Sequence, residues 1–281
     1  MRKINIISDC TSDLTPELLE KYNIRVFPLF ITFGEESYRG GVDLTTKQLF
    51  ELIKQKDMLP HTASVSPQYF VDLVKEYPTD EDVIYMGISG GISGTFNNAC
   101  LAREECPNFY PIDSGNLSTG IGLLLLKAAK YRDQGLSAAE IVDKIEEIKP
   151  RVRTQFAIDT LDYLHKGGRC SGTARLIGTL LKIKPIIKVV DGKMVVAKKP
   201  IGNYKKALDV LLEMFDADIE HIDPDFVFVT HPDTHVDAIY LMDELNKRNV
   251  QIDNIVETNA SSVIAAHCGP RTIGILYIVK E

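Results

Sequence analysis

The sequence predicts an α/β protein: an N-terminal, mainly parallel sheet with flanking helices, followed by a second α+β domain with a mixed sheet and a hairpin. Two observations carry this prediction. In the first half of the chain, short apolar runs alternate with segments of helical composition, a pattern typical of parallel sheets. Farther along, two β-branched runs flank Asp191-Gly192, a strong hairpin signal. Because 281 residues exceed what one core usually serves, we expect two domains, at 1–150 and 151–281.

In the N-terminal domain, each strand is expected to lead into a helix. Strands are assigned to 3–8, 25–33, 83–86 and 108–112, helices to 16–22, 46–54, 67–76, 96–106, 118–132 and 138–149, and loops to 34–43 and 55–67. Thr15 and Ser137 are typical helix N-caps, and either Thr45 or Thr46 can cap the helix at 46–54. The helix at 118–132 is apolar almost all round from Ile121 to Leu126, which indicates burial.

The C-terminal domain has a different pattern, in which strands and helices no longer alternate regularly. Strands are assigned to 152–158, 225–230, 252–258 and 271–279, and two more to the β-branched runs that flank Asp191-Gly192 within 184–201. Helices are assigned to 161–168, 173–181, 204–215 and 234–249. Asn203 caps the third of these helices. We place the domain boundary near Pro150.

Composition and charge argue against several classes of partner. The formal net charge is −7, and no basic run offsets it, which argues against nucleic acid or an anionic membrane. Five cysteines without a C-x-x-C pair argue against a disulfide framework or a zinc knuckle and favour reduced thiols. No apolar run approaches the length of a membrane span, so no integral membrane segment is expected. We therefore expect a cytoplasmic protein.

A glycine-rich turn from Gly87 to Thr95 joins the strand at 83–86 to a helix. Its glycines let the backbone approach a ligand closely, and the helix start offers unpaired N–H groups that suit an anion. We therefore predict an anion site at Ser93, Gly94 and Thr95; the alternative is a tight turn with a Ser/Thr cap.

The same turn contains a match to the G-x-S-x-G motif of α/β-hydrolases. A serine hydrolase would use Ser89 as its nucleophile and His267 as the late histidine. Against this alternative, a second Ser-Gly follows at once, the helix begins after Ser93, and no HGGG-type segment precedes the turn. The P-loop and the G-x-G-x-x-G fingerprint are absent.

Metal binding is weakly supported. His231 and His235 lie four residues apart near a strand end, but no third ligand suggests itself, so a solvated helix cap is the better interpretation. Asp9 and Asp13 could hold a cation, although turn and capping roles explain them equally well. We expect no metal and no cofactor.

Several polar residues elsewhere have ordinary turn or cap explanations when each is taken alone. They are His61, Thr62, Ser64, Arg169 and His267. Together they form a hydroxyl-rich, weakly basic set. Beside the very apolar helix segment 121–126, such a set would suit an acid headgroup with a long hydrocarbon tail.

Seven segments, in order along the chain, resemble those of the DegV family of bacterial fatty-acid-binding proteins, which includes FakB, a subunit of fatty acid kinase. The segments are SDCTSDLTPE, PLFITFGEESY, HTASVSP, GISGGISGTFNNA, IDSGNLSTGIG, LHKGGR and HCGP. The resemblance covers essentially the whole chain. So many segments in register are far more specific than any one of them.

The resemblance implies a non-catalytic carrier that holds a long-chain fatty acid, such as palmitate, stearate or oleate, between its two domains. Carried over by position, Ser93 and Thr62 bond the carboxylate and His267 lies close to it. Arg169 lies near the headgroup or holds the domain contact. The family presents its fatty acid to an ATP-using kinase partner, which makes an acyl phosphate. This chain reads Ile201-Gly202-Asn203-Tyr204 where the family often has arginine, a departure that bears on the kinase more than on the lipid.

Overall fold

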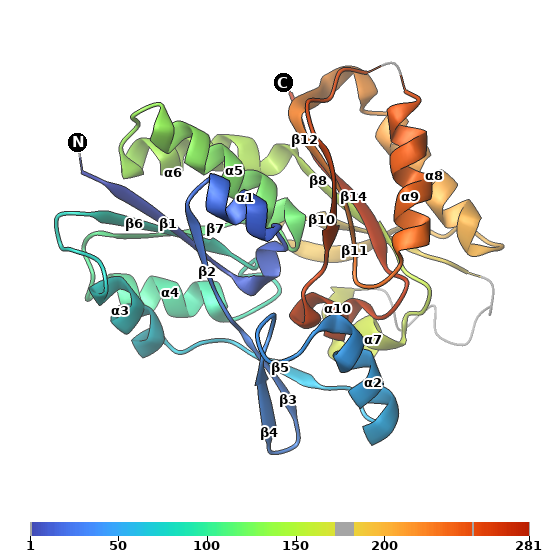
Figure 1. Ribbon diagram of the computed structural model, residues 1–281, viewed down its shortest axis with the longest axis horizontal. Coiled ribbons are helices and arrows are strands. Elements are labelled where there is room, and N and C mark those ends of the chain that lie inside the picture. The colour runs from blue at the N-terminus through green and yellow to red at the C-terminus, as the bar shows by residue number, and fades with distance from the viewer. Residues whose placement is uncertain (1, 172–182, 249, 281) are drawn as a thin grey trace.

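The computed structural model describes residues 2–171, 183–248 and 250–280. Three sheets organise these residues. A four-stranded sheet and a seven-stranded sheet occupy opposite sides of the view in Figure 1, and a small three-stranded sheet projects below them. The α/β fold class predicted from the sequence is confirmed.

The four-stranded sheet is entirely parallel and has the order β2-β1-β6-β7. Its strands are β1 (Ile4–Asp9), β2 (Ile24–Phe27), β6 (Asp82–Gly87) and β7 (Phe109–Asp113). The helices around it are α1 (Pro16–Lys21), α3 (Pro67–Lys75), α4 (Thr95–Arg103), α5 (Thr119–Asp133) and α6 (Ala138–Ile148). In Figure 1, α3 and α4 lie below the sheet, and α1, α5 and α6 lie above it. Every residue of β6 is buried, which explains its continuous apolar run.

The seven-stranded sheet is mixed and has the order β13-β12-β14-β8-β10-β11-β9. Its strands are β8 (Val152–Ala157), β9 (Cys170–Ser171), β10 (Ile186–Val190), β11 (Lys193–Lys198), β12 (Ile222–His231), β13 (Ile255–Asn259) and β14 (Ile273–Val279). Helices α8 (Tyr204–Asp216) and α9 (His235–Asn246) join strands of this sheet in a second apolar cluster. The predicted hairpin is confirmed: Asp191 and Gly192 have φ of 49° and 72°, as a tight two-residue turn requires.

Helix N-caps that the sequence predicts are confirmed in two helices. Helix α2 (Thr46–Lys56) begins with a capping box between Thr45 and Gln48, which settles the choice of cap in favour of Thr45. Helix α6 has the same arrangement between Ser137 and Glu140. In each pair the two side chains satisfy backbone N–H groups at the helix start, an interaction that depends only on residues three apart.

The predicted strand at 25–33 is wrong, because two strands of different sheets share this segment. Strand β2 ends at Phe27, and β3 (Phe30–Phe33) pairs with β4 (Glu36–Arg39) and β5 (His61–Ala63). The chain changes direction at Pro28, which has no N–H to continue a ladder. The Leu29 N–H instead meets the Cys10 sulfur at 3.3 Å. The regions assigned to loops therefore contain β4 and β5, short strands whose exposed residues show no apolar alternation.

The remaining short elements are the helices α7 (Asp162–Gly167) and α10 (Ser262–Cys268) and the turns η1 (Cys10–Ser12), η2 (Lys149–Arg151) and η3 (Ile219–His221). Helix α10 was not among the predicted elements, although Gly269-Pro270 indicates a helix stop after it. The predicted helix at 173–181 lies outside the described residues. The domain boundary near Pro150 stays a prediction. None of the described helices is both long and apolar enough to cross a membrane.

Candidate ligand-binding site

A cavity of about 340 Å³ lies where the turn after β6 meets β5, α10 and β11. Five of the six residues predicted for the site line it: Thr62 from β5, Ser93 and Gly94 from the glycine-rich turn, Arg169 after α7, and His267 from α10. The sixth, Thr95, is not part of the lining and is buried at the first position of α4. Segments more than 200 residues apart in the sequence thus share one cavity.

The polar end of the cavity is organised by a hydrogen bond between Thr62 and His267. Thr62 Oγ1 and His267 Nε2 are 2.8 Å apart. The pairing of β5 with β3 places Thr62 opposite Ile31 and so aligns it on the small sheet. Gly167 leaves room for the imidazole, since a Cβ at that position would lie 2.7 Å from His267 Nδ1.

His267 is neutral at physiological pH. Burial, together with the smaller effects of the charges of Arg169 and His61, lowers its pKa from 6.5 to about 4. A neutral imidazole can donate from Nε2 or accept there, but not both. The polar end of the cavity therefore combines hydroxyl groups with an uncharged ring.

Ser93 is oriented by its neighbour Thr95. The two hydroxyl oxygens are 2.9 Å apart, and the Thr95 N–H donates to Ser93 Oγ at 3.3 Å. The amide at the helix start is therefore already used within the turn. Of the predicted anion site, Ser93 and Gly94 reach the cavity, whereas Thr95 supports Ser93 from behind.

The start of the glycine-rich turn is held by Asp9 at the end of β1. Its carboxylate accepts from the Ile88 N–H at 3.0 Å and from the Tyr85 hydroxyl at 2.9 Å. A Cβ on Gly87 would lie 2.1 Å from this carboxylate, so only glycine allows the approach. Asp13 similarly accepts from Ser118 Oγ at 2.6 Å and from the Ser261 N–H at 2.8 Å. The two acids thus tie loops together, and these bonds explain them without a cation.

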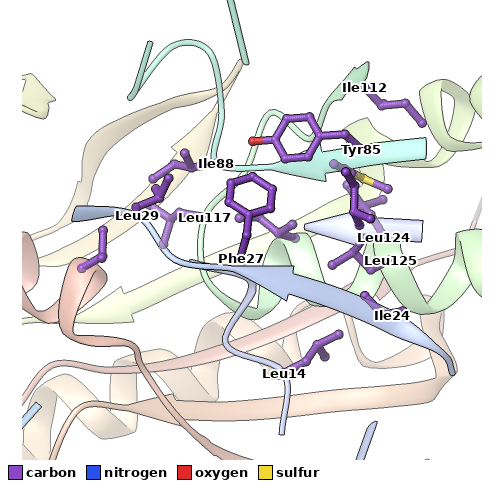
Figure 2. Packing of buried hydrophobic residues seen from close by; sticks show 14 of the residues in the cluster. Leu14, Ile24, Phe27, Leu29, Tyr85, Ile88, Ile112, Leu117, Leu124 and Leu125 are labelled. Atoms are coloured by element: carbon purple, nitrogen blue, oxygen red, sulfur yellow. The ribbon is translucent and has the colours of Figure 1, made fainter. Parts of the chain in front are cut away.

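The other end of the cavity is apolar. It is lined by Leu29, Ile88, Leu117, Met194, Val263, Ile264 and Cys268. Figure 2 shows Leu29, Ile88 and Leu117 gathered at one end of the parallel sheet. A small apolar pocket of about 20 Å³ continues from there and shares Leu117, Ile264 and Cys268 with the main cavity.

The expectation that the helix segment 121–126 lies beside the headgroup residues is wrong. Its side chains are buried in the core, and none of them lines the cavity. Figure 2 places Leu124 and Leu125 near Ile24, away from Leu117. Leu117, which precedes the helix, takes this role, and nothing in the local pattern around it distinguishes a wall residue from a core residue. Ser64 and Asn97 also line the cavity; Ser64 belongs to a segment that the sequence singled out, whereas Asn97 carries no such signal.

The structure does not support the serine hydrolase alternative. Ser89 is fully buried; its hydroxyl donates to the Gly192 carbonyl at 2.9 Å and accepts from the Gly91 N–H at 3.1 Å. His267 is bonded to Thr62 instead. The nucleophile and the base that the motif requires are therefore each engaged elsewhere.

The interpretation of His231 and His235 as a solvated cap needs correction. His231 is buried, and Glu257 joins the pair by accepting from His231 Nε2 at 2.7 Å and by contacting His235 Nδ1. His231 Nδ1 accepts from the Thr234 N–H at 3.0 Å, which places the ring proton on Nε2. That nitrogen then has no lone pair for a metal, although the three side chains are close enough to suggest one.

The whole chain matches known proteins. A sequence model described as "Uncharacterised protein, DegV family" matches residues 3–280. A DegV domain-containing protein of Clostridium perfringens is 35% identical over 281 residues, 99% of each chain. A structure reported for fatty acid binding of a DegV-family protein from Thermus thermophilus matches with a TM-score of 0.91 at 28% identity, covering 99% of this chain and 100% of that one. The structure of DegV, a fatty-acid-binding protein from Bacillus subtilis, matches with a TM-score of 0.88 at 31% identity over 100% of both chains. The chain belongs to the DegV family.

Proposed function

We propose that this protein is a carrier that binds one long-chain fatty acid in the cavity, with the carboxylate at Thr62 and Ser93 and His267 close by. The observation that carries the proposal is that one cavity is lined both by hydroxyl groups, the neutral ring of His267 and Arg169, and by a set of apolar side chains. The fatty-acid-binding relatives of this chain support it.

The hydrogen bonds suggest how two neutral hydroxyls hold an anion. With the proton on Nε2, His267 donates to Thr62 Oγ1, and the Thr62 hydroxyl is then free to donate to a carboxylate oxygen. In the same way, with the Thr95 hydroxyl as the donor of its hydrogen bond to Ser93 Oγ, the Ser93 hydroxyl is free to donate to the carboxylate. Hydrogen bonds to a charged acceptor are the stronger kind, so two of them offset much of the cost of burying the carboxylate.

The tail is proposed to follow the apolar wall from Ile88 and Leu117 toward Ile264 and the small pocket beyond it. Each buried CH₂ contributes about 0.8 kcal/mol, so the tail supplies most of the affinity. In this proposal the protein does no chemistry on the ligand. It presents the carboxylate to an ATP-dependent fatty acid kinase, the role that the family resemblance implies.

The first experiment is native mass spectrometry of the purified protein, followed by denaturing extraction of whatever is bound. We expect about one fatty acid per chain. Titration calorimetry with saturated acids from ten to sixteen carbons should then show Kd falling about fourfold per CH₂ until the pocket is filled. A protein that is empty and takes up neither palmitate nor oleate would refute the carrier proposal.

The kinase step needs a separate test. Loaded protein, a bacterial fatty acid kinase subunit and ATP should together yield acyl phosphate, detected as the hydroxamate after hydroxylamine treatment. Protein that binds the fatty acid but supports no acyl phosphate would leave the carrier proposal standing and remove the kinase from it.

A further inference from the structure

The tip of the β10–β11 hairpin rests directly on the glycine-rich turn. Ser89 Oγ donates to the carbonyl oxygen of Gly192 at 2.9 Å and accepts from the N–H of Gly91 at 3.1 Å. A Cβ on Gly91 would lie 2.6 Å from the Gly192 oxygen, and one on Gly192 would lie 2.6 Å from Ser89 Oγ. The approach is so close that neither glycine has room for a side chain.

This contact separates two cavities. Gly91 and Met194 line the proposed fatty-acid cavity. On the other side, Ser89, Gly91, Asp191 and Gly192 line a second cavity of about 500 Å³. The hairpin tip and the turn therefore form the wall between the two spaces.

The hairpin tip is weakly supported by the rest of its sheet. Strand β10 pairs with β8 only from Ile186 to Lys188, although β10 continues to Val190. Strand β11 pairs with β9 at Met194 and Val195. Residues 189–193 thus project beyond the pairing on both sides, and the hydrogen bond from Ser89 joins this tip to the turn.

We infer that Ser89 is a positioning residue whose hydrogen bond to Gly192 holds the hairpin tip on the glycine-rich turn, a contact that we call the clasp. Opening of the clasp sets the rates at which ligand leaves and enters the cavity. The inference rests on the proposed fatty-acid binding. Ser89 touches no ligand in this scheme. It holds together the two segments that carry Met194 and Ser93, so its loss widens the space between them.

The clasp should affect rates more than affinity. Loss of one neutral hydrogen bond shifts an opening equilibrium about fivefold. Ser89→Ala should therefore speed both release and uptake of cis-parinaric acid about fivefold in stopped-flow fluorescence, with Kd changed less than about twofold. A purely structural defect would instead raise Kd together with the release rate.

A reversible cross-link tests the same idea in the opposite direction. The Ser89 Cβ and a Cβ built on Gly192 are 3.9 Å apart, within the range of about 3.5–4.5 Å that disulfides require. In the double variant Ser89→Cys/Gly192→Cys, oxidation with diamide should slow parinarate exchange about tenfold or more, and dithiothreitol should restore it. The reduced variant controls for the strain of a side chain at Gly192, where φ is 72°. Wild type treated with diamide controls for the exposed Cys100.

The outcomes separate the two claims. If wild type binds no parinarate, the proposed function fails, and the clasp fails with it. Suppose instead that wild type binds parinarate, and that the oxidised variant, with its disulfide verified by mass spectrometry, exchanges ligand as fast as the dithiol form of the same variant. Only the clasp is then overturned. A Ser89→Ala protein that binds with unchanged rates would also overturn it.

Discussion

The two cavities beside the hairpin tip differ more in charge than in size. The larger one, of about 500 Å³, is lined by five ionisable side chains: Asp113, Lys149, Arg153, Lys188 and Asp191. The smaller one is about 340 Å³ in volume. Among the described residues, its basic side chains are Arg169 and His267, and the ring of His267 is neutral. Gly91 borders both.

Cavity volume is therefore a poor guide to the site that an apolar ligand occupies. A hydrocarbon tail in the larger cavity would displace water from charged groups, which is costly unless new partners replace it. In the smaller cavity a tail would meet Ile88 and Leu117, and Arg169 is the one charged side chain among the described residues that line it. The smaller cavity is therefore the better match for a fatty acid.

The largest expected effect comes from removing the Thr62 and Ser93 hydroxyls of the smaller cavity. Each hydrogen bond to a charged group contributes about 1.5–3 kcal/mol, so Thr62→Ala/Ser93→Ala should raise the Kd for palmitate about 100-fold or more. The matched control is Lys188→Ala in the larger cavity, which should leave Kd unchanged in calorimetry. Equal losses in the two variants would erase the distinction between the cavities.

A smaller effect is expected from the glycine pair that ends α7. Gly167→Ala would place a Cβ 2.7 Å from His267 Nδ1 and push the ring off Thr62. Because one hydrogen bond to the carboxylate is then weakened, we expect Kd to rise about tenfold. The neighbouring Gly168 has φ of 67° and open space around it. Gly168→Ala should therefore lower stability without changing Kd, and a change in Kd there would contradict the steric argument.

The smallest expected effect is the pH dependence of Kd, which tests whether the His267 ring in the smaller cavity stays neutral. The pKa of His267 is about 4, so the ring is neutral from about pH 6 to 8. The ratio of Kd values for His267→Gln and wild type should vary less than about twofold over that range.

The same pKa affects stability. The unfolded chain takes up the His267 proton near pH 6.5 and the folded chain only near pH 4. Folded wild type therefore loses stability as the pH falls through this window, and His267→Gln should remove that loss in urea titrations. For the binding experiment, a ratio of the two Kd values that changes tenfold near pH 6.5 would mean that the His267 ring is charged.

Much of the candidate site could be predicted, but only as a set of separate segments. Thr62, Ser93, Gly94, Arg169 and His267 all reach one cavity. The distances among them depend on contacts such as that between β5 and α10, which no local pattern encodes. The apolar wall was harder to predict. Leu117 and the segment 121–126 are equally apolar in sequence, and only packing decides that the first borders a cavity while the second fills the core.

Features that short-range interactions control can be read from the amino-acid sequence. The capping boxes at Thr45 and Ser137, the turn at Asp191-Gly192 and the fully buried β6 all depend on neighbouring residues or on simple periodicity. Three other features depend on contacts between distant segments: the break at Pro28, the pairing of β4 and β5 with β3, and the hydrogen bond from Ser89 to the hairpin. These features arise where distant segments satisfy each other's hydrogen bonds and exclude water, and such contacts exist only once the chain has folded.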